Sequence, residues 1–168
     1  MPRVHFVKKA RRAVPHAGIA AGDSYYWWQF AFAPKSFSKT PPKPSQLTRS
    51  DFLQQFYALQ EDFDVSGATD AEDIKDKLEE LKSELKSLAD EQESKKSSMP
   101  DQLQESETGE LLQARADKCR ELVDEIDNII LKVDAVNSDS FEDESEYIEA
   151  CREEASSGVD NMDWSDAG

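Results

Sequence analysis

The chain has 168 residues, of which 33% are charged and only 38% hydrophobic, a composition that argues against one large apolar core. Its formal net charge of −16 hides a division: residues 1–50 carry nine Lys and Arg against one acid, a net +8, whereas residues 51–168 carry eleven against thirty-five, a net −24. No stretch approaches the roughly 18 apolar residues that span a bilayer, and the two isolated cysteines have no metal-binding spacing, so we predict a cytoplasmic protein without cofactor or metal.

The first forty residues are predicted to form a small antiparallel sheet. Val4 and Phe6 alternate with polar residues, which is typical of a short strand. The run YYWWQFAF, residues 25–32, is the strongest strand pattern because aromatic side chains suit a pleated surface, and residues 35–40 are its predicted partner in a β-hairpin. Alternation along this run separates an aromatic face from a mixed one. The aromatic face comprises Tyr26, Trp28, Phe30 and Phe32, and the mixed face Tyr25, Trp27, Gln29 and Ala31.

A proline-rich spacer, residues 40–44, ends the sheet, and a helix follows from Asp51 to Phe63. The apolar residues of this helix recur at intervals of four, three and four: Phe52, Phe56, Leu59 and Phe63. We expect this stripe to pack on the aromatic face of the hairpin and to close a basic domain over residues 1–66.

Residues 67–137 are predicted to form a long antiparallel helical hairpin. One heptad seam consists of Ile74, Leu78, Leu81, Leu85 and Leu88, and a second of Leu112, Ala116, Cys119, Val123, Ile126, Ile130 and Val133. The seams are roughly symmetric about residue 100, which would place Leu88 opposite Leu112 and Ile74 opposite Ile126. Further apolar residues, Leu122, Ile129 and Val136, widen the second stripe, so a partner chain or another helix should cover that side.

The C-terminal part is predicted to hold an acidic helix over residues 138–156 and a disordered acidic tail over residues 157–168. An alternative for the tail is a short linear motif around Met162 and Trp164. Taken together, the patterns predict an α+β, mostly helical fold, with the small sheet at the N-terminus and the helical arms after it.

Enzymatic signatures are absent from the sequence. It contains no phosphate-binding glycine motif, no nucleophile elbow and no HExxH, and its two histidines lie in the basic N-terminal segment. Acidic runs such as EDESE are typical of solvated helix faces, because nothing supplies the buried pocket that shifts a carboxylate pKa. We therefore predict a protein that is not an enzyme and has no small-molecule substrate.

The basic aromatic segment is the strongest candidate for a binding site. Cations neutralise phosphates, and flat rings accept bases by stacking, at about 1–3 kcal/mol per base. The candidate nucleic-acid-binding residues are Arg3, Lys8, Lys9, Arg11, Arg12, Tyr25, Trp27, Lys35, Lys39 and Lys43. The alternative is that the aromatic residues are a core and the cations solvate it. The composition of residues 1–22, basic with no acid, also resembles an organellar transit peptide.

The pattern SYYWWQFAFAPKSFSKTPPKPSQLT following PRVHFVKKARR resembles a recurrent N-terminal block in small proteins of tailed bacteriophages. This resemblance covers about residues 2–55 and implies a phage-encoded protein acting in a host cell. More distantly, a basic strand, a turn and a second strand ending in Ser-Lys before a helix is similar to the arm-type DNA-binding domain of phage integrases. That similarity implies that Tyr25, Trp27, Lys35 and Lys39 face nucleic acid.

Three functions remain open at this point. The favoured one is an accessory interaction protein that binds nucleic acid, or a host complex bearing it, through the basic domain, with a possible homo-oligomer through the arms. The second is a DNA mimic, in which the acidic helices occupy a host nucleic-acid-binding protein. The third is a virion structural or assembly protein. The candidate partner-binding residues are Leu122, Ile129, Val136, Glu142, Asp143, Glu144 and Glu146.

Overall fold

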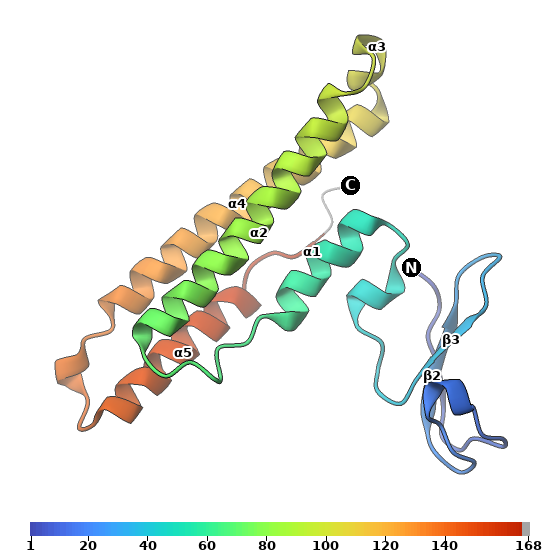
Figure 1. Ribbon diagram of the computed structural model, residues 1–168, viewed down its shortest axis with the longest axis horizontal. Coiled ribbons are helices and arrows are strands. Elements are labelled where there is room, and N and C mark those ends of the chain that lie inside the picture. Colours follow the sequence, from blue (N-terminus) through green and yellow to red (C-terminus); the bar gives the residue numbers. More distant parts are fainter. Residues whose placement is uncertain (166–168) are drawn as a thin grey trace. The chain divides into compact units, whose positions relative to one another are not determined.

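The computed structural model describes residues 1–165 and shows the predicted α+β, mostly helical fold (Figure 1). The chain divides into two compact units, Met1–Ala58 and Leu59–Gly168, and the division falls within helix α1, Asp51–Asp62. The N-terminal unit contains the sheet, and the second unit contains the long helices.

The sheet of the N-terminal unit has three short antiparallel strands in the order β1-β2-β3. Strand β1 covers His5–Val7, β2 covers Tyr25–Gln29 and β3 covers Lys35–Ser38. In register, His5 lies opposite Trp27, and Trp27 lies opposite Phe37. Two single-turn 3-10 helices, Pro15–Ala17 and Pro44–Leu47, follow β1 and β3, each beginning at a proline whose fixed φ suits a helical first turn.

The aromatic face of β2 differs in part from the prediction. Trp28 is buried, but the strand ends at Gln29, and Phe32 lies fully exposed in the turn before β3. The expectation that Phe32 packs on the helix is therefore wrong. The physical reason is the turn itself: Ala33 N–H donates to the carbonyl of Phe30, and Phe32 has a φ of 60°, which ends the alternation of an extended strand.

Helix α1 contains only part of the predicted apolar stripe, because Leu59 is half-buried and Phe63 lies beyond the last residue of the helix, Asp62. Phe52 and Phe56 are buried, with ring centroids 5.4 Å apart, and Tyr57 is buried beside them. Ser50 caps the start of the helix by accepting from the N–H of Leu53 at 3.4 Å. Just before α1, Arg49 Nη1 donates to the carbonyl of Ala31 at 3.2 Å, which ties this end of the helix to the turn of the sheet.

The second unit is built on the predicted helical hairpin (Figure 1). Its arms are α2, Ala71–Ser97, and α4, Glu107–Ala135, joined through the short helix α3, Asp101–Gln104. Asp70 caps α2 and Ser106 caps α4, each through its side-chain oxygen. All five residues of the first seam are buried, whereas in the second seam Leu112 and Ile130 are only half-buried.

The register of the hairpin differs from the predicted symmetry about residue 100. Lys75 Nζ lies 3.2 Å from Asp134 Oδ1, and Lys82 Nζ lies 2.5 Å from Asp127 Oδ1. These ion pairs centre the hairpin between residues 104 and 105, so the start of α2 lies opposite the C-terminal end of α4 and not opposite Ile126. The reason is the connection, because α3 and its flanking turns delay the start of α4 to Glu107.

A third helix, α5 (Glu144–Asp160), covers the wide stripe of α4 and also contacts α2. It lies along the open end of the hairpin, away from α3 (Figure 1). Leu122 and Ile129 are buried, and Val136 is half-buried where α4 ends. Of the two alternatives, another helix covers this side. The expectation that Leu122 and Ile129 form an exposed partner or virion-assembly contact is therefore wrong.

The tail also differs from the prediction. Helix α5 continues to Asp160, and the chain then places Met162 and Trp164 in buried positions. Trp164 Nε1 donates to the carbonyl of Val159 at 3.0 Å, and Lys118 Nζ on α4 lies 3.0 Å from Asp163 Oδ2. The predicted disorder is thus wrong for residues 157–165, because an apolar anchor and an ion pair hold the segment. Residues 166–168 lie outside the described part of the chain.

Candidate nucleic-acid interface

One face of the N-terminal sheet gathers aromatic rings from all three strands. Cross-strand neighbours in an antiparallel sheet point to the same side, so His5, Trp27 and Phe37 lie in a row. The rings of His5 and Trp27 are stacked, with centroids 4.1 Å apart and planes 7° from parallel. Tyr25 extends the row, since its centroid lies 6.0 Å from that of Phe37. We call this surface the Trp27 face.

A cation lies directly on the Trp27 face. Lys35 Nζ is 4.1 Å from the centroid of the Trp27 ring, within the range of a cation–π interaction. Trp27 is half-buried, and its ring already contacts the ring of His5 and the ammonium group of Lys35. An incoming base would have to displace one of these two groups. The Trp27 face therefore offers a cationic group held on an aromatic ring, and not an open surface on which a base could stack.

The other predicted cations lie around this sheet. Lys8, Lys9, Arg11 and Arg12 are exposed in the segment that follows β1, which we call the basic loop. Two backbone hydrogen bonds fix this loop: Ala10 N–H donates to the carbonyl of Asp23 at 2.7 Å, and Gly22 N–H donates to the carbonyl of Ala10 at 2.9 Å. The basic loop therefore presents its cations from a defined backbone position.

Two of these cations share a hollow, and one of the predicted lysines has an acidic neighbour. Lys9 and Arg11 line a shallow hollow floored by Ala10, Ala21 and Gly22. Lys39 Nζ lies 3.3 Å from Asp23 Oδ2. The pKa of Asp23 is lowered, first by the hydrogen bond from the backbone of Ala20 and then by Lys39. Lys39 is thus partly neutralised, whereas Arg3 and Lys43 are exposed at the two ends of the sheet region.

The structure places three of the predicted nucleic-acid-binding residues on one face of the sheet and adds aromatic residues that were not predicted to lie there. Tyr25, Trp27 and Lys35 share the Trp27 face as expected, and His5 and Phe37 join them. His16 also contacts this surface, with its ring centroid 5.6 Å from that of Phe37. The alternation of His5 with Val4 and Phe6 was a signal for its face, but the strand register that sets His5 against Trp27 could not be read from the sequence.

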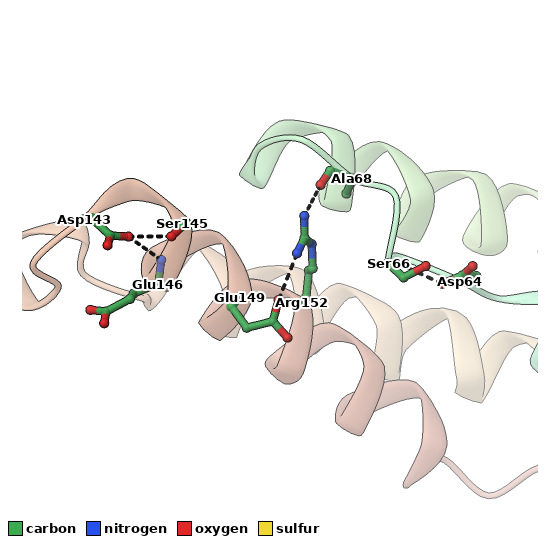
Figure 2. A network of polar contacts seen from close by, with 8 residues as sticks. All are labelled: Asp64, Ser66, Ala68, Asp143, Ser145, Glu146, Glu149 and Arg152. Atoms are coloured by element: carbon green, nitrogen blue, oxygen red, sulfur yellow. Dashed lines mark hydrogen bonds and ion pairs between the residues drawn. The ribbon is translucent and has the colours of Figure 1, made fainter.

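The four acidic residues predicted to bind a partner, Glu142, Asp143, Glu144 and Glu146, do not all have the same role. Figure 2 shows Asp143 capping α5: its Oδ1 accepts from the N–H of Glu146 at 2.9 Å and from Ser145 Oγ at 2.6 Å. These bonds, that of Ser145 first, lower the pKa of Asp143. Glu142, Glu144 and Glu146 are exposed around this cap. Asp143 is therefore a structural residue, and the other three are surface carboxylates.

A second polar contact in Figure 2 joins α5 to the segment before α2. Arg152 Nη2 donates to the carbonyl of Ala68 at 2.5 Å, while its Nη1 lies 2.9 Å from Glu149 Oε2. In the same segment, Asp64 Oδ1 accepts from the N–H of Ser66 at 2.8 Å. These contacts hold the connection between α1 and α2 against α5, and they account for Arg152 as a structural cation.

No metal-binding arrangement is found within residues 1–165. In this range no three His, Cys, Asp or Glu side chains are placed to hold a metal ion, and none of the helices combines the length and the apolar composition that a bilayer span requires. Both cysteines are buried, and burial raises the pKa of Cys119 to about 12. A thiol in this environment is an apolar packing group and a poor nucleophile.

The chain thus combines a basic unit built on a three-stranded sheet with an acidic helical unit, in which α5 covers the hairpin of α2 and α4. Comparisons of the chain with known protein families, curated proteins and solved structures find no match.

Proposed function

We propose that the protein is a non-enzymatic accessory protein that binds nucleic acid, or a complex bearing nucleic acid, through its N-terminal unit. In the setting that the phage resemblance suggests, it would act in an infected host cell. The observation that carries this proposal is the combination of the Trp27 face with the basic loop on one small sheet. Cations placed by fixed backbone and supported by aromatic rings suit a phosphate backbone.

The charge distribution supports the same proposal. Residues 1–50 have a net charge of +8 in a chain whose remainder is −24. Such a basic patch is unnecessary for solubility in a strongly acidic protein, and it raises the local concentration of polyanions. In the second unit, by contrast, Lys75, Lys82 and Lys118 each lie within 3.2 Å of a carboxylate. Lys75 and Lys82 join α2 to α4, and Lys118 joins α4 to the C-terminal segment.

The experiment that tests the proposal is fluorescence anisotropy of single-stranded and double-stranded oligonucleotides against the full chain across a salt series. Neutralising the basic loop by replacing Lys8, Lys9, Arg11 and Arg12 with Ala should weaken binding. It should also reduce the slope of log K against log salt by up to about 0.7 per lost cation on a single strand.

A matched control removes the same charge from the second unit, through Ala at Lys77, Lys86, Lys95 and Lys132, all of which are exposed. This control should retain most of the affinity and the salt slope. Equal losses in both variants would mean that net charge alone governs the binding. No binding by the unaltered chain at low salt would refute the proposal.

A second candidate function, the DNA mimic, is favoured by the exposed carboxylates of Glu142, Glu144 and Glu146. They lie together on one short segment, as phosphates do along a backbone. If this function is correct, the full chain should bind host proteins that duplex DNA displaces from it. Replacing these three residues with Lys should abolish that capture, whereas Trp27→Ala should leave it intact. Asp143 is kept in this test because it caps α5.

A further inference from the structure

Phe32 is an exposed aromatic residue in an unusual backbone conformation. Its relative exposure is 109%, and its φ of 60° lies in the left-handed region. Bulky residues without glycine's freedom rarely adopt this conformation, because Cβ approaches the following carbonyl. A full-size apolar ring at such a position gains nothing for folding, since it buries no surface within the described chain.

The turn that carries Phe32 is braced on both sides. Gln29 Nε2 donates to the carbonyl of Ala33 at 2.8 Å, and Arg49 Nη1 donates to the carbonyl of Ala31 at 3.2 Å. The guanidinium carbon of Arg49 also lies 5.7 Å from the centroid of the Phe30 ring. The flanking residues therefore hold the backbone of the tip in place while the ring of Phe32 points into solvent.

The charge around the tip is positive. Arg49 contacts the turn directly, Lys35 begins the next strand, and no acid occurs between residues 24 and 50. Ala31 and Ala33 add little apolar surface, so the tip offers one ring beside cations. A bilayer or an apolar protein groove rewards a wider apolar surface, whereas a single base is matched by one ring with phosphate-binding cations beside it.

We propose that Phe32 is a base-stacking residue, which receives an unpaired base of single-stranded nucleic acid while Arg49 contacts a neighbouring phosphate. This inference rests on the proposed function and adds to it the place where a base is held. It also assigns different tasks to two surfaces: the Trp27 face and the basic loop attract the backbone, and the turn holds the base.

The test compares Phe32→Ala, Phe32→Gly and Phe32→Trp in the full chain, with Phe6→Ala as the matched control. Phe6 is also exposed, at 57%, but its ring contacts Tyr26 at 4.9 Å on the other side of the sheet. Each variant is titrated with a labelled single-stranded oligonucleotide, a duplex of the same sequence and anionic phospholipid vesicles. Thermal unfolding checks the fold, which none of the Phe32 changes should weaken because the ring is fully exposed.

We expect Phe32→Ala and Phe32→Gly to raise the Kd for the single strand by about 5- to 150-fold, the value of one stacked base, with an unchanged salt slope. Phe32→Trp should keep the affinity, and its added indole fluorescence should be quenched on binding. Phe6→Ala should bind like the unaltered chain.

The possible failures are distinguishable. If the unaltered chain binds the oligonucleotide and Phe32→Ala binds equally well, the inference is overturned and the proposed function stands. A loss confined to vesicles would overturn it in favour of a lipid surface, and a loss confined to the duplex would overturn its assignment to unpaired bases. If the unaltered chain binds no oligonucleotide, the proposed function and the inference both fall.

Discussion

Gly158 offers a direct test of how α5 packs on α4, because two opposing effects meet at this position. An ideal Cβ at Gly158 would lie 2.8 Å from Cγ1 and 2.9 Å from Cδ1 of Ile129. Within a helix, Gly→Ala gains about 1 kcal/mol of helix propensity. Forcing an extra carbon into a packed contact costs typically about 1–3 kcal/mol, and the β-branched Ile129 has few rotamers with which to move away.

The balance predicts that Gly158→Ala lowers the free energy of unfolding by up to about 2 kcal/mol. Ile129→Ala removes Cγ1 and Cδ1, and also Cγ2, which would lie 3.1 Å from the added carbon. In that background, Gly158→Ala should therefore raise the free energy of unfolding by about 1 kcal/mol. The sign of the same substitution thus reverses, and the coupling energy of the double-mutant cycle should be about 1–3 kcal/mol.

The assay is urea unfolding followed by circular dichroism at 222 nm for the four proteins of the cycle. Ile129→Ala alone should cost about 2–5 kcal/mol, as for other buried Ile side chains. Ser156→Ala, an exposed position of the same helix, serves as the control for propensity and should be neutral or slightly stabilising. If Gly158→Ala stabilises the chain in both backgrounds, α5 does not pack on Ile129 as described.

Three further predictions concern the second unit. Gln92 is 1% exposed in the α2 seam, and its Nε2 has no hydrogen-bond partner within residues 1–165, so Gln92→Leu should stabilise the unit by about 1–3 kcal/mol in urea unfolding. Lys118 first, and then hydrogen bonds with Ser165, lower the pKa of Asp163 to about 2, so the stability from these contacts is present above about pH 4 and is lost as the pH falls towards 2. Asp163→Asn should mimic that loss at neutral pH, seen as faster exchange of the Trp164 indole N–H, whereas unchanged exchange would contradict it. Cys119 should resist iodoacetamide at pH 8 until urea unfolds the chain, because burial keeps its thiol protonated.

The helical arms could be predicted from the sequence because their information is local. Apolar residues at alternating spacings of four and three specify a seam whatever lies opposite, and Asp70 before Ala71 is a recognisable cap. The register could not be predicted, since it depends on how many residues the connection uses before α4 begins. The ion pair of Lys82 with Asp127 exists only in the register that α3 produces.

The C-terminal segment shows the limit of reasoning from composition. Small polar and acidic residues after Ser156 indicated disorder, yet the segment is held through Trp164 and Asp163. The ion pair of Asp163 depends on where α5 ends relative to Lys118 on α4, which is a property of helix packing and not of the segment itself. The wide stripe on α4 was recognised, but the choice between a partner chain and α5 required the tertiary structure.

In the candidate interface, residue types could be predicted but their exposure could not. An aromatic run beside lysines suggests stacking at Trp27, but the strand register places His5 and Lys35 on that ring. The most exposed aromatic side chain in the sheet region is instead Phe32, which the alternation assigned to the core. The strand ends at Gln29 and a turn follows, so the alternation does not extend to Phe32, because it holds only while the backbone is extended.

The two units also use charge in different ways, and this difference bears on how binding should respond to salt. In the second unit the interhelical pairs Lys75–Asp134, Lys82–Asp127 and Arg120–Glu93 place cations against the carboxylates of the neighbouring arm. A polyanion that approached these cations would have to displace carboxylates that are already in contact.

The basic loop of the N-terminal unit has side chains exposed to solvent, and its backbone is fixed, so a phosphate can approach it at little cost in side-chain order. Because exposed charges are screened beyond about 10 Å at 0.1 M salt, the excess of carboxylates should weaken binding most at low salt. The salt slope measured for the full chain should therefore be shallower than the cations of residues 1–50 alone would give.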